Sequence, residues 1–228
     1  MLALTGSGEY LPPMEEVDRG LIRRLPAPAR VVCLPTAAGT EGPERIGYWS
    51  QLGIDHFTRL GAQVEALPVI DRASANDPGL ATVILKANFV YLSGGKPTYL
   101  YNTLSGSRAW EAILAVLEQG GLLAGCSAGA MIMGEKFYGF PGLKTGFNFL
   151  SGATVVPHFD EISQAFLQPI RLAAGNKLTL VGIEGNTALL QSKSEAGVRY
   201  EVLGSGGVTI WNGRGRKRYT HGLMPGWV

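Results

Sequence analysis

The sequence has few cysteines, little net charge and no long apolar run. Its two cysteines, Cys33 and Cys126, lie far apart in apolar segments, which is typical of buried reduced thiols and excludes a disulfide framework. No stretch reaches the roughly 18 consecutive apolar residues of a transmembrane helix, and Met1–Gly6 lacks a basic, apolar leader. These absences predict a cytoplasmic protein that binds no membrane.

The charge balance likewise excludes a strongly electrostatic partner. The formal net charge is +2, and the basic residues are concentrated only in the short run Arg214, Arg216, Lys217 and Arg218. We interpret this run as the solvated end of a hairpin, so no nucleic-acid partner is predicted. The three histidines are scattered without ligand spacing, and no metal site is predicted either.

What the sequence has is enough apolar material for one substantial core. Apolar residues make up 46% of the 228 residues and charged residues only 17%, which is typical of a globular protein with a well-covered sheet. We expect a single domain over residues 1–228, and the sequence leaves the oligomeric state open, a homodimer included.

Short β-branched runs alternate with longer segments of helical period, which predicts βαβ units and a mostly parallel sheet. The predicted strands are residues 2–5, 30–35, 63–69, 89–92, 121–125 and 178–183. An apolar stripe predicts a helix over 46–60, and Ser107 is the expected N-cap of another. After Ile183 the pattern alternates over 187–191, 200–203 and 208–211, which predicts antiparallel hairpins at one sheet edge.

The motif Gly125–Gly129 follows the predicted strand and has the spacing G-x-S-x-G. This spacing predicts a nucleophile elbow, a sharp strand-to-helix turn that exposes its central residue, Ser127. A turn of small residues that only packs a helix closely onto a sheet is the alternative reading. Cys126 is the competing nucleophile, but it precedes the apex and should face the packing layer.

A serine nucleophile needs a base, and His158 is the best placed of the three histidines. It follows the β-rich run 153–157, so it should emerge at the end of a strand, where the loops of parallel sheets converge. His56 and His221 are read as packing or surface residues. Glu184, at the end of another predicted strand, is the expected acid of the triad; Asp160 and Glu161 should begin the next helix, and Glu135 is a weaker alternative.

The oxyanion of an acyl-transfer reaction needs N–H donors, and two segments offer them. Gly94 and Gly95 end a predicted strand, and glycines let the backbone approach a substrate closely. The N–H groups of Gly95 and Ala128 are therefore the predicted oxyanion hole. An ordinary tight turn at Gly94–Gly95 is the alternative.

Several motifs together give the chain a family resemblance. They are Gly6–Glu9, Ser93–Gly95, Gly125–Ala130, Pro157–Phe159 and Gly182–Leu189. With these motifs the chain resembles the serine peptidase family of aspartyl dipeptidase (dipeptidase E) and cyanophycinase. The resemblance implies a three-layer, doubly wound, flavodoxin-like sheet of the class I glutamine amidotransferase type, and hydrolysis of small peptides without a cofactor.

Carried over to this chain, the resemblance makes Ser127 the nucleophile, His158 the base, Gly95 an oxyanion donor and Glu184 the triad acid. The acidic-residue preference of the family would need a cationic pocket, for which Lys96, Lys136 and Lys144 are the candidates. The Arg-rich stretch of cyanophycinases after His-Phe and the Asp of aspartyl dipeptidase before the His are both missing here, so neither specificity transfers.

Three other functions stay open at this level. An amidase or esterase acting on a non-peptide acyl compound would differ only in pocket shape. A non-catalytic binding or sensor protein would keep the elbow for packing alone. A glutamine amidotransferase is disfavoured, because Cys126 lies off the apex of the turn.

Overall fold

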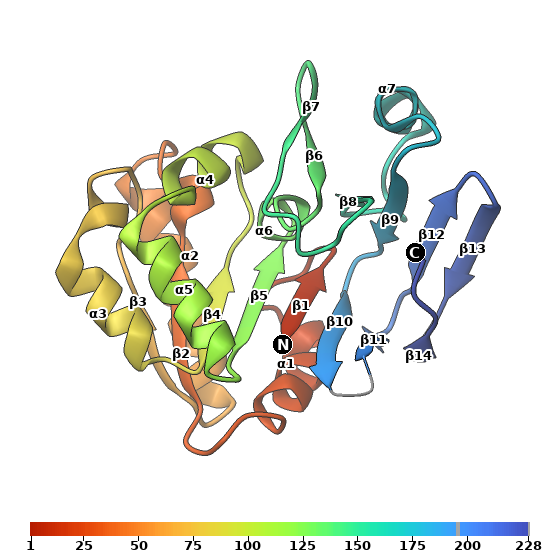
Figure 1. Ribbon diagram of the computed structural model, residues 1–228. Coiled ribbons are helices and arrows are strands. Elements are labelled where there is room, and N and C mark those ends of the chain that lie inside the picture. The colour runs from red at the N-terminus through yellow and green to blue at the C-terminus, as the bar shows by residue number, and fades with distance from the viewer. Residues whose placement is uncertain (195–196, 228) are drawn as a thin grey trace.

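A computed structural model, which describes residues 1–194 and 197–227, is built around an eight-stranded sheet (Figure 1). The strand order is β14 (Gly222–Met224), β11 (Gly197–Gly204), β10 (Thr187–Ser194), β1 (Leu2–Thr5), β5 (Leu122–Cys126), β4 (Phe89–Leu92), β2 (Arg30–Leu34) and β3 (Gln63–Ala66). The strands from β1 to β3 in this order run parallel, and β10, β11 and β14 continue the sheet antiparallel. The predicted α/β class with a mostly parallel sheet and antiparallel C-terminal strands is confirmed.

Helices cover both faces of this sheet because its central strands are apolar on both sides. On β1, Leu2 and Leu4 belong to one buried cluster and Ala3 to the other, as the two-residue period of a strand requires. The cluster with Ala3 packs against α1 (Glu15–Ile22) and α2 (Pro43–Arg59). The opposite cluster packs against α3 (Pro78–Lys86), α4 (Pro97–Leu104) and α5 (Arg108–Glu118), which gives three layers.

The helix ends follow local signals in the sequence. Ser107 caps α5 as predicted, since its hydroxyl accepts a hydrogen bond of 3.1 Å from the N–H of Trp110. Helix α2 begins at Pro43, three residues before the predicted start, because a proline at the first helical position has no N–H to leave unsatisfied. Within the described part of the chain, no helix combines the length and apolar character needed to cross a bilayer.

A second sheet of four strands stands beside the first one. Its order is β13 (Gly215–Tyr219), β12 (Val208–Asn212), β9 (Thr179–Ile183) and β8 (Ala153–Val156), with β8 and β9 parallel. The expectation that all the parallel strands share one sheet is therefore wrong for β8 and β9. Strand β1 already has β5 on one side and β10 on the other, so no edge beside it is open to β9.

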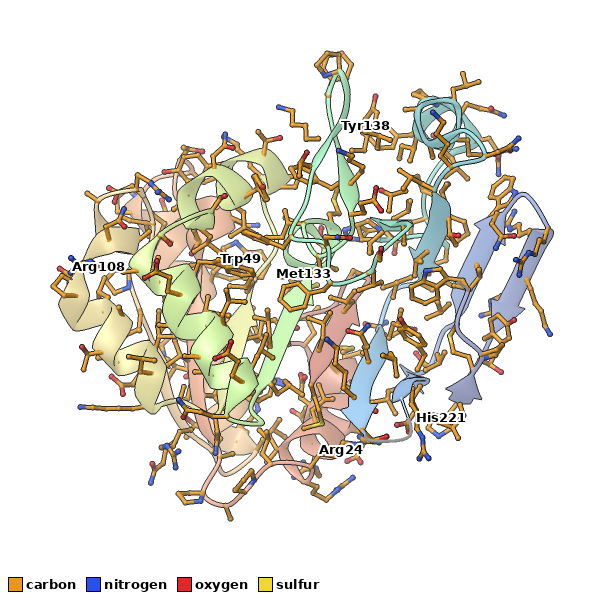
Figure 2. The ribbon with its side chains drawn as sticks, in the orientation of Figure 1. Arg24, Trp49, Arg108, Met133, Tyr138 and His221 are labelled. Atoms are coloured by element: carbon orange, nitrogen blue, oxygen red, sulfur yellow. The ribbon has the colours of Figure 1, made fainter. Side chains whose placement is uncertain are left out.

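A hairpin that the sequence did not reveal rises above the carboxyl end of β5, and a helix stands beside it above β9 (Figure 1). The hairpin joins β6 (Lys136–Gly139) to β7 (Gly142–Thr145), and the helix is α7 (Gln164–Ala174). Tyr138, labelled in Figure 2 on the hairpin, lies edge-on to Phe166 of α7 with 6.2 Å between ring centroids. The two elements thus face each other across the end of the sheet where Ser127 lies.

Candidate active site

Ser127 occupies a strained turn between β5 and the short helix α6 (Ala128–Met131). Its φ of 49° and ψ of −106° lie outside the regions that a residue with a side chain favours, a conformation that costs about 1–3 kcal/mol. The backbone around it holds this conformation, because its N–H donates to the Thr5 carbonyl at 3.0 Å and its own carbonyl accepts from Met131 at 2.9 Å. The turn is the nucleophile elbow that the sequence predicts.

The glycines of the motif are required by close backbone contacts. A Cβ atom at Gly129 would lie 2.7 Å from the carbonyl oxygen of Leu92, and one at Gly125 would collide with the Gly129 carbonyl. Because neither glycine has a side chain, α6 can pack closely on the ends of β4 and β5. The G-x-S-x-G spacing therefore follows from packing, and that packing places the serine hydroxyl at the end of the sheet.

The structure brings Ser127 and His158 together although 31 residues separate them. The Ser127 Oγ lies 3.0 Å from the His158 Nε2, within hydrogen-bond distance. His158 follows β8, and its φ of 51° turns the chain toward the elbow. Both side chains are half-buried, so they are open to a substrate while partly shielded from water.

Gly95 follows the glycine that packs against Ser127, and Ala128 directly follows Ser127 in the chain. A Cβ atom at the neighbouring Gly94 would lie 3.3 Å from the Ser127 Cβ, which shows how closely the loop approaches. In the described ranges, the N–H groups of Gly95 and Ala128 donate to no protein acceptor, whereas those of Gly94 and Ser127 do. Gly95 has a φ of 140°, and a Cβ atom there would meet the Ala37 carbonyl at 2.6 Å, so only glycine fits.

Glu9 is a site residue for which the sequence analysis assigned no role. Its buried carboxylate accepts from the Gly94 N–H at 3.0 Å and from the Cys126 thiol at 2.9 Å. It thereby ties the glycine loop to the strand that carries the elbow. The signal in the sequence is an acid in the loop that follows β1, the strand next to β5.

Cys126 is turned away from the reaction centre. It is fully buried among apolar side chains on the α1 and α2 face, and its thiol donates to Glu9. Burial, and then the nearby Glu9 carboxylate, raise the pKa of the Cys126 thiol well above its ordinary value. The thiol therefore stays protonated and is a poor nucleophile.

Glu184, the predicted triad acid, is engaged elsewhere. Its carboxylate accepts from Arg218 Nη2 at 2.6 Å and from the Gly207 N–H at 2.9 Å. Across residues 1–194 and 197–227, no carboxylate oxygen lies within 4.0 Å of a ring nitrogen of His158. The expected contact between Glu184 and His158 is thus not formed, because a bidentate guanidinium is the stronger partner.

The ion pair with Arg218 makes a prediction for acid stability. Hydrogen bonding from Arg218 lowers the pKa of Glu184, so the folded-state pKa lies below the unfolded value of about 4.3. The pair stabilises the fold above that pH, and its contribution is lost as the pH falls through the folded-state pKa. Because Arg218 is half-exposed, we expect Glu184→Gln to cost only about 0.5–1 kcal/mol at pH 7 and less at pH 3.

Urea unfolding of the wild type and of Glu184→Gln at pH 7 and pH 3 measures the difference in their free energies of unfolding. The matched control is Glu16→Gln, whose side chain is 82% exposed beside Arg19 and which should change stability at neither pH. Equal stability of Glu184→Gln and wild type at pH 7 would contradict the prediction.

The other acids considered from the sequence have structural contacts of their own. Asp160 accepts from the Gly185 N–H at 2.8 Å, and Glu135 accepts from the Gly152 N–H at 2.8 Å. The expectation that Asp160 and Glu161 begin a helix is wrong, because α7 begins at Gln164 after the cap Ser163. The segment between His158 and Ser163 is a turn, in which the Glu161 N–H donates to the His158 carbonyl.

The remaining histidines and the basic run lie outside the reaction centre. His56 is fully buried and paired with Asp18 at 2.8 Å, so of the two predicted roles it has the packing one, and His221 is exposed. The basic run forms β13 rather than only a hairpin end. Its Arg216 lies 5.2 Å over the Phe159 ring, and this strand supplies the arginine that holds Glu184.

These features define a class. A parallel-centred sheet with helices on both faces carries, at the end of an inner strand, a strained serine paired with a histidine and flanked by free N–H groups. That arrangement is typical of α/β serine hydrolases.

Comparison with known proteins gives the family. Residues 2–198 match the family model for peptidase family S51, so the chain belongs to this serine peptidase family, as the resemblance in its motifs predicts. A cyanophycinase from Geminocystis herdmanii (strain PCC 6308) is 26% identical over 181 residues, which cover 74% of this chain but only 65% of that protein.

Two solved structures share the fold. A peptidase from an acI-B1 Actinobacterium matches with a TM-score of 0.88 and 33% identity over 99% of this chain and 96% of the other. A putative peptidase E protein from Listeria monocytogenes EGD-e matches with a TM-score of 0.63 and 18% identity, over 96% and 97% of the two chains. The second similarity is one of fold alone.

Proposed function

We propose that this protein hydrolyses small peptides through an acyl-enzyme on Ser127. The observation that carries the proposal is the 3.0 Å contact between the Ser127 Oγ and the His158 Nε2 at a strained elbow. Family membership supports peptide substrates. The resulting chemistry needs no cofactor.

In the proposed reaction, Ser127 attacks the peptide carbonyl while His158 Nε2 takes the hydroxyl proton. The carbonyl oxygen becomes an oxyanion that accepts from the free N–H groups of Gly95 and Ala128. His158 returns the proton to the leaving amine, the C–N bond breaks, and the acyl group stays on Ser127. Water, deprotonated by the same histidine, then releases the acid product and restores the serine.

Glu184 as the triad acid stays a prediction. Its carboxylate could orient His158 only after leaving Arg218, and the two residues are already near in the fold, since the Phe159 N–H donates to the Ile183 carbonyl at 3.1 Å. In the structure, the ion pair of Glu184 with Arg218 links the end of β9 to β13. A Glu184→Gln variant that lowers kcat without changing KM would support a role in orienting the histidine.

Labelling with a small fluorophosphonate tests the proposal without knowledge of the substrate. We expect one adduct on wild type, mapped to Ser127 by peptide mass spectrometry, and none on Ser127→Ala. His158→Ala should be labelled about 10²- to 10⁴-fold more slowly, because the base that activates the serine is lost.

The outcomes of the labelling experiment separate the proposed function from its alternative. An adduct on Ser127 that depends on His158 supports a serine hydrolase. No adduct on folded wild-type protein would overturn the proposal and favour a binding protein that keeps the elbow for packing.

A further inference from the structure

A large cavity opens beside the Ser127 hydroxyl. Its volume is about 780 Å³, which suits a small ligand, and both Ser127 and His158 form part of its wall. Gly95 with its free N–H lies in the wall as well. A substrate in this cavity would therefore touch the proposed nucleophile, the base and one of the two oxyanion donors.

The wall of this cavity is predominantly apolar. Its apolar and aromatic members include Tyr138, Phe140, Val155, Val156, Phe166 and Ile170. They come from the β6–β7 hairpin, the end of β8 and helix α7, the elements that face each other in Figure 1. Phe140 is 84% exposed and Phe166 59% exposed, an unusual placement for large apolar side chains that a bound apolar group would explain.

The wall of the cavity has one lysine, Lys96, and one glutamate, Glu161, so these side chains give it no excess of positive charge. The ammonium group of Lys96, which lines the cavity, donates to Thr40 at 2.8 Å, and Lys136 donates to Thr145 at 3.1 Å without being a wall residue. Glu161 contributes a carboxylate to the wall, which would repel a second carboxylate. Of the three lysines expected to form a cationic pocket, Lys96, Lys136 and Lys144, only Lys96 lines the cavity, so that pocket is not assembled among the described residues.

We propose that the preferred substrates carry a bulky apolar side chain, such as leucine or phenylalanine, next to the scissile bond. The inference rests on the proposed function, since the cavity selects a side chain only if Ser127 performs the cleavage. An apolar side chain is stabilised by moving from water to this wall, whereas an aspartyl or glutamyl side chain would lose hydration and would meet Glu161 as well as Lys96.

Cleavage of two matched sets of dipeptides tests the inference. The sets are X-Ala and Ala-X, with leucine, phenylalanine, alanine, aspartate or glutamate at X, and released amino acids are measured by mass spectrometry. At one of the two positions we expect kcat/KM for leucine or phenylalanine to exceed that for alanine about tenfold or more. Aspartate and glutamate at that position should fall below alanine.

The variant Phe166→Ala tests whether the apolar wall of the cavity causes the preference for apolar side chains. This change should reduce the ratio of kcat/KM for phenylalanine over alanine about threefold to tenfold, because part of the apolar wall is removed. The matched control is Leu172→Ala on the same helix, whose side chain is 80% exposed outside this cavity and which should leave the ratio unchanged. Neither side chain belongs to the buried core.

The failures of the two proposals are distinguishable. Preference for aspartate or glutamate, or a ratio that Phe166→Ala leaves unchanged, would overturn the apolar specificity and keep the serine peptidase. Labelling of Ser127 by the fluorophosphonate without cleavage of any dipeptide would also overturn the specificity while leaving a serine hydrolase. Absence of both labelling and cleavage would overturn the proposed function and the specificity together.

Discussion

Replacement of Ser127 with alanine is expected to abolish peptide hydrolysis and to leave the fold intact. The hydroxyl is the only group in the proposed reaction that forms a covalent bond to the substrate, so its loss should lower kcat about 10⁴- to 10⁶-fold. The backbone contacts that hold residue 127 in its strained conformation involve its N–H and carbonyl, which alanine keeps. The measurement is steady-state cleavage of the best dipeptide, with circular dichroism and urea unfolding to monitor the fold.

Cys126→Ser is the matched control for this experiment. It replaces the neighbouring residue, preserves a donor toward Glu9 and introduces no new group at the elbow apex. We expect this variant to keep most of the wild-type activity. A large loss in Cys126→Ser together with activity in Ser127→Ala would identify the cysteine as the nucleophile and contradict the mechanism.

The largest effect on stability is expected from the buried pair of Asp18 and His56. The Asp18 Oδ2 lies 2.8 Å from the His56 Nε2, and the two side chains are 1% and 0% exposed. Burial raises the pKa of Asp18, and the hydrogen bond and charge of His56 act against that rise. Asp18→Ala should therefore cost about 3–5 kcal/mol, because it leaves the imidazole without a partner in an apolar environment.

Urea unfolding of the single and double variants measures this coupling. The double variant Asp18→Ala, His56→Ala should cost less than the sum of the two single changes, since each single change leaves one polar group unpaired. The control is Asp55→Ala on the same helix as His56, which loses only a contact with Gln51 on the exposed surface and should stay within about 0.5 kcal/mol of wild type. Additive costs would show that the pair is not coupled. If Asp18→Ala does not fold, the conservative Asp18→Asn supplies the same comparison.

Asp18 and His56 belong to a group of buried polar side chains on the α1 and α2 face of the sheet. The face covered by α1 and α2 holds Tyr10, Tyr91 and Cys33 close to Asp18 and His56, all fully buried. Glu9 lies at the end of this buried polar group and touches both the elbow strand and the glycine loop. Glu9 therefore holds the elbow strand and the glycine loop from the α1 and α2 face, whereas the cavity beside Ser127 is lined by the hairpin and α7.

Much of the local structure could be predicted from the sequence, because its causes lie within a few residues. The apolar runs of β1, β4 and β5 and the cap at Ser107 depend on neighbouring side chains and on backbone preferences. The elbow is also local, since the spacing of Gly125 and Gly129 already reflects how closely a helix must approach a strand. These segments carry the family resemblance as well.

The contacts that define the site join residues far apart in the chain, so they depend on how the whole chain packs. Arg218 lies 34 residues after Glu184 and takes the carboxylate that the sequence assigned to His158. Strand β9 moves to a second sheet because β10 occupies the edge beside β1, which no local pattern encodes. The apolar cavity likewise forms only where the hairpin, β8 and α7 meet. Local sterics, which can be read from the sequence, thus set the elbow and the order of strands and helices. Packing between distant segments set the partner of Glu184 and the lining of the cavity.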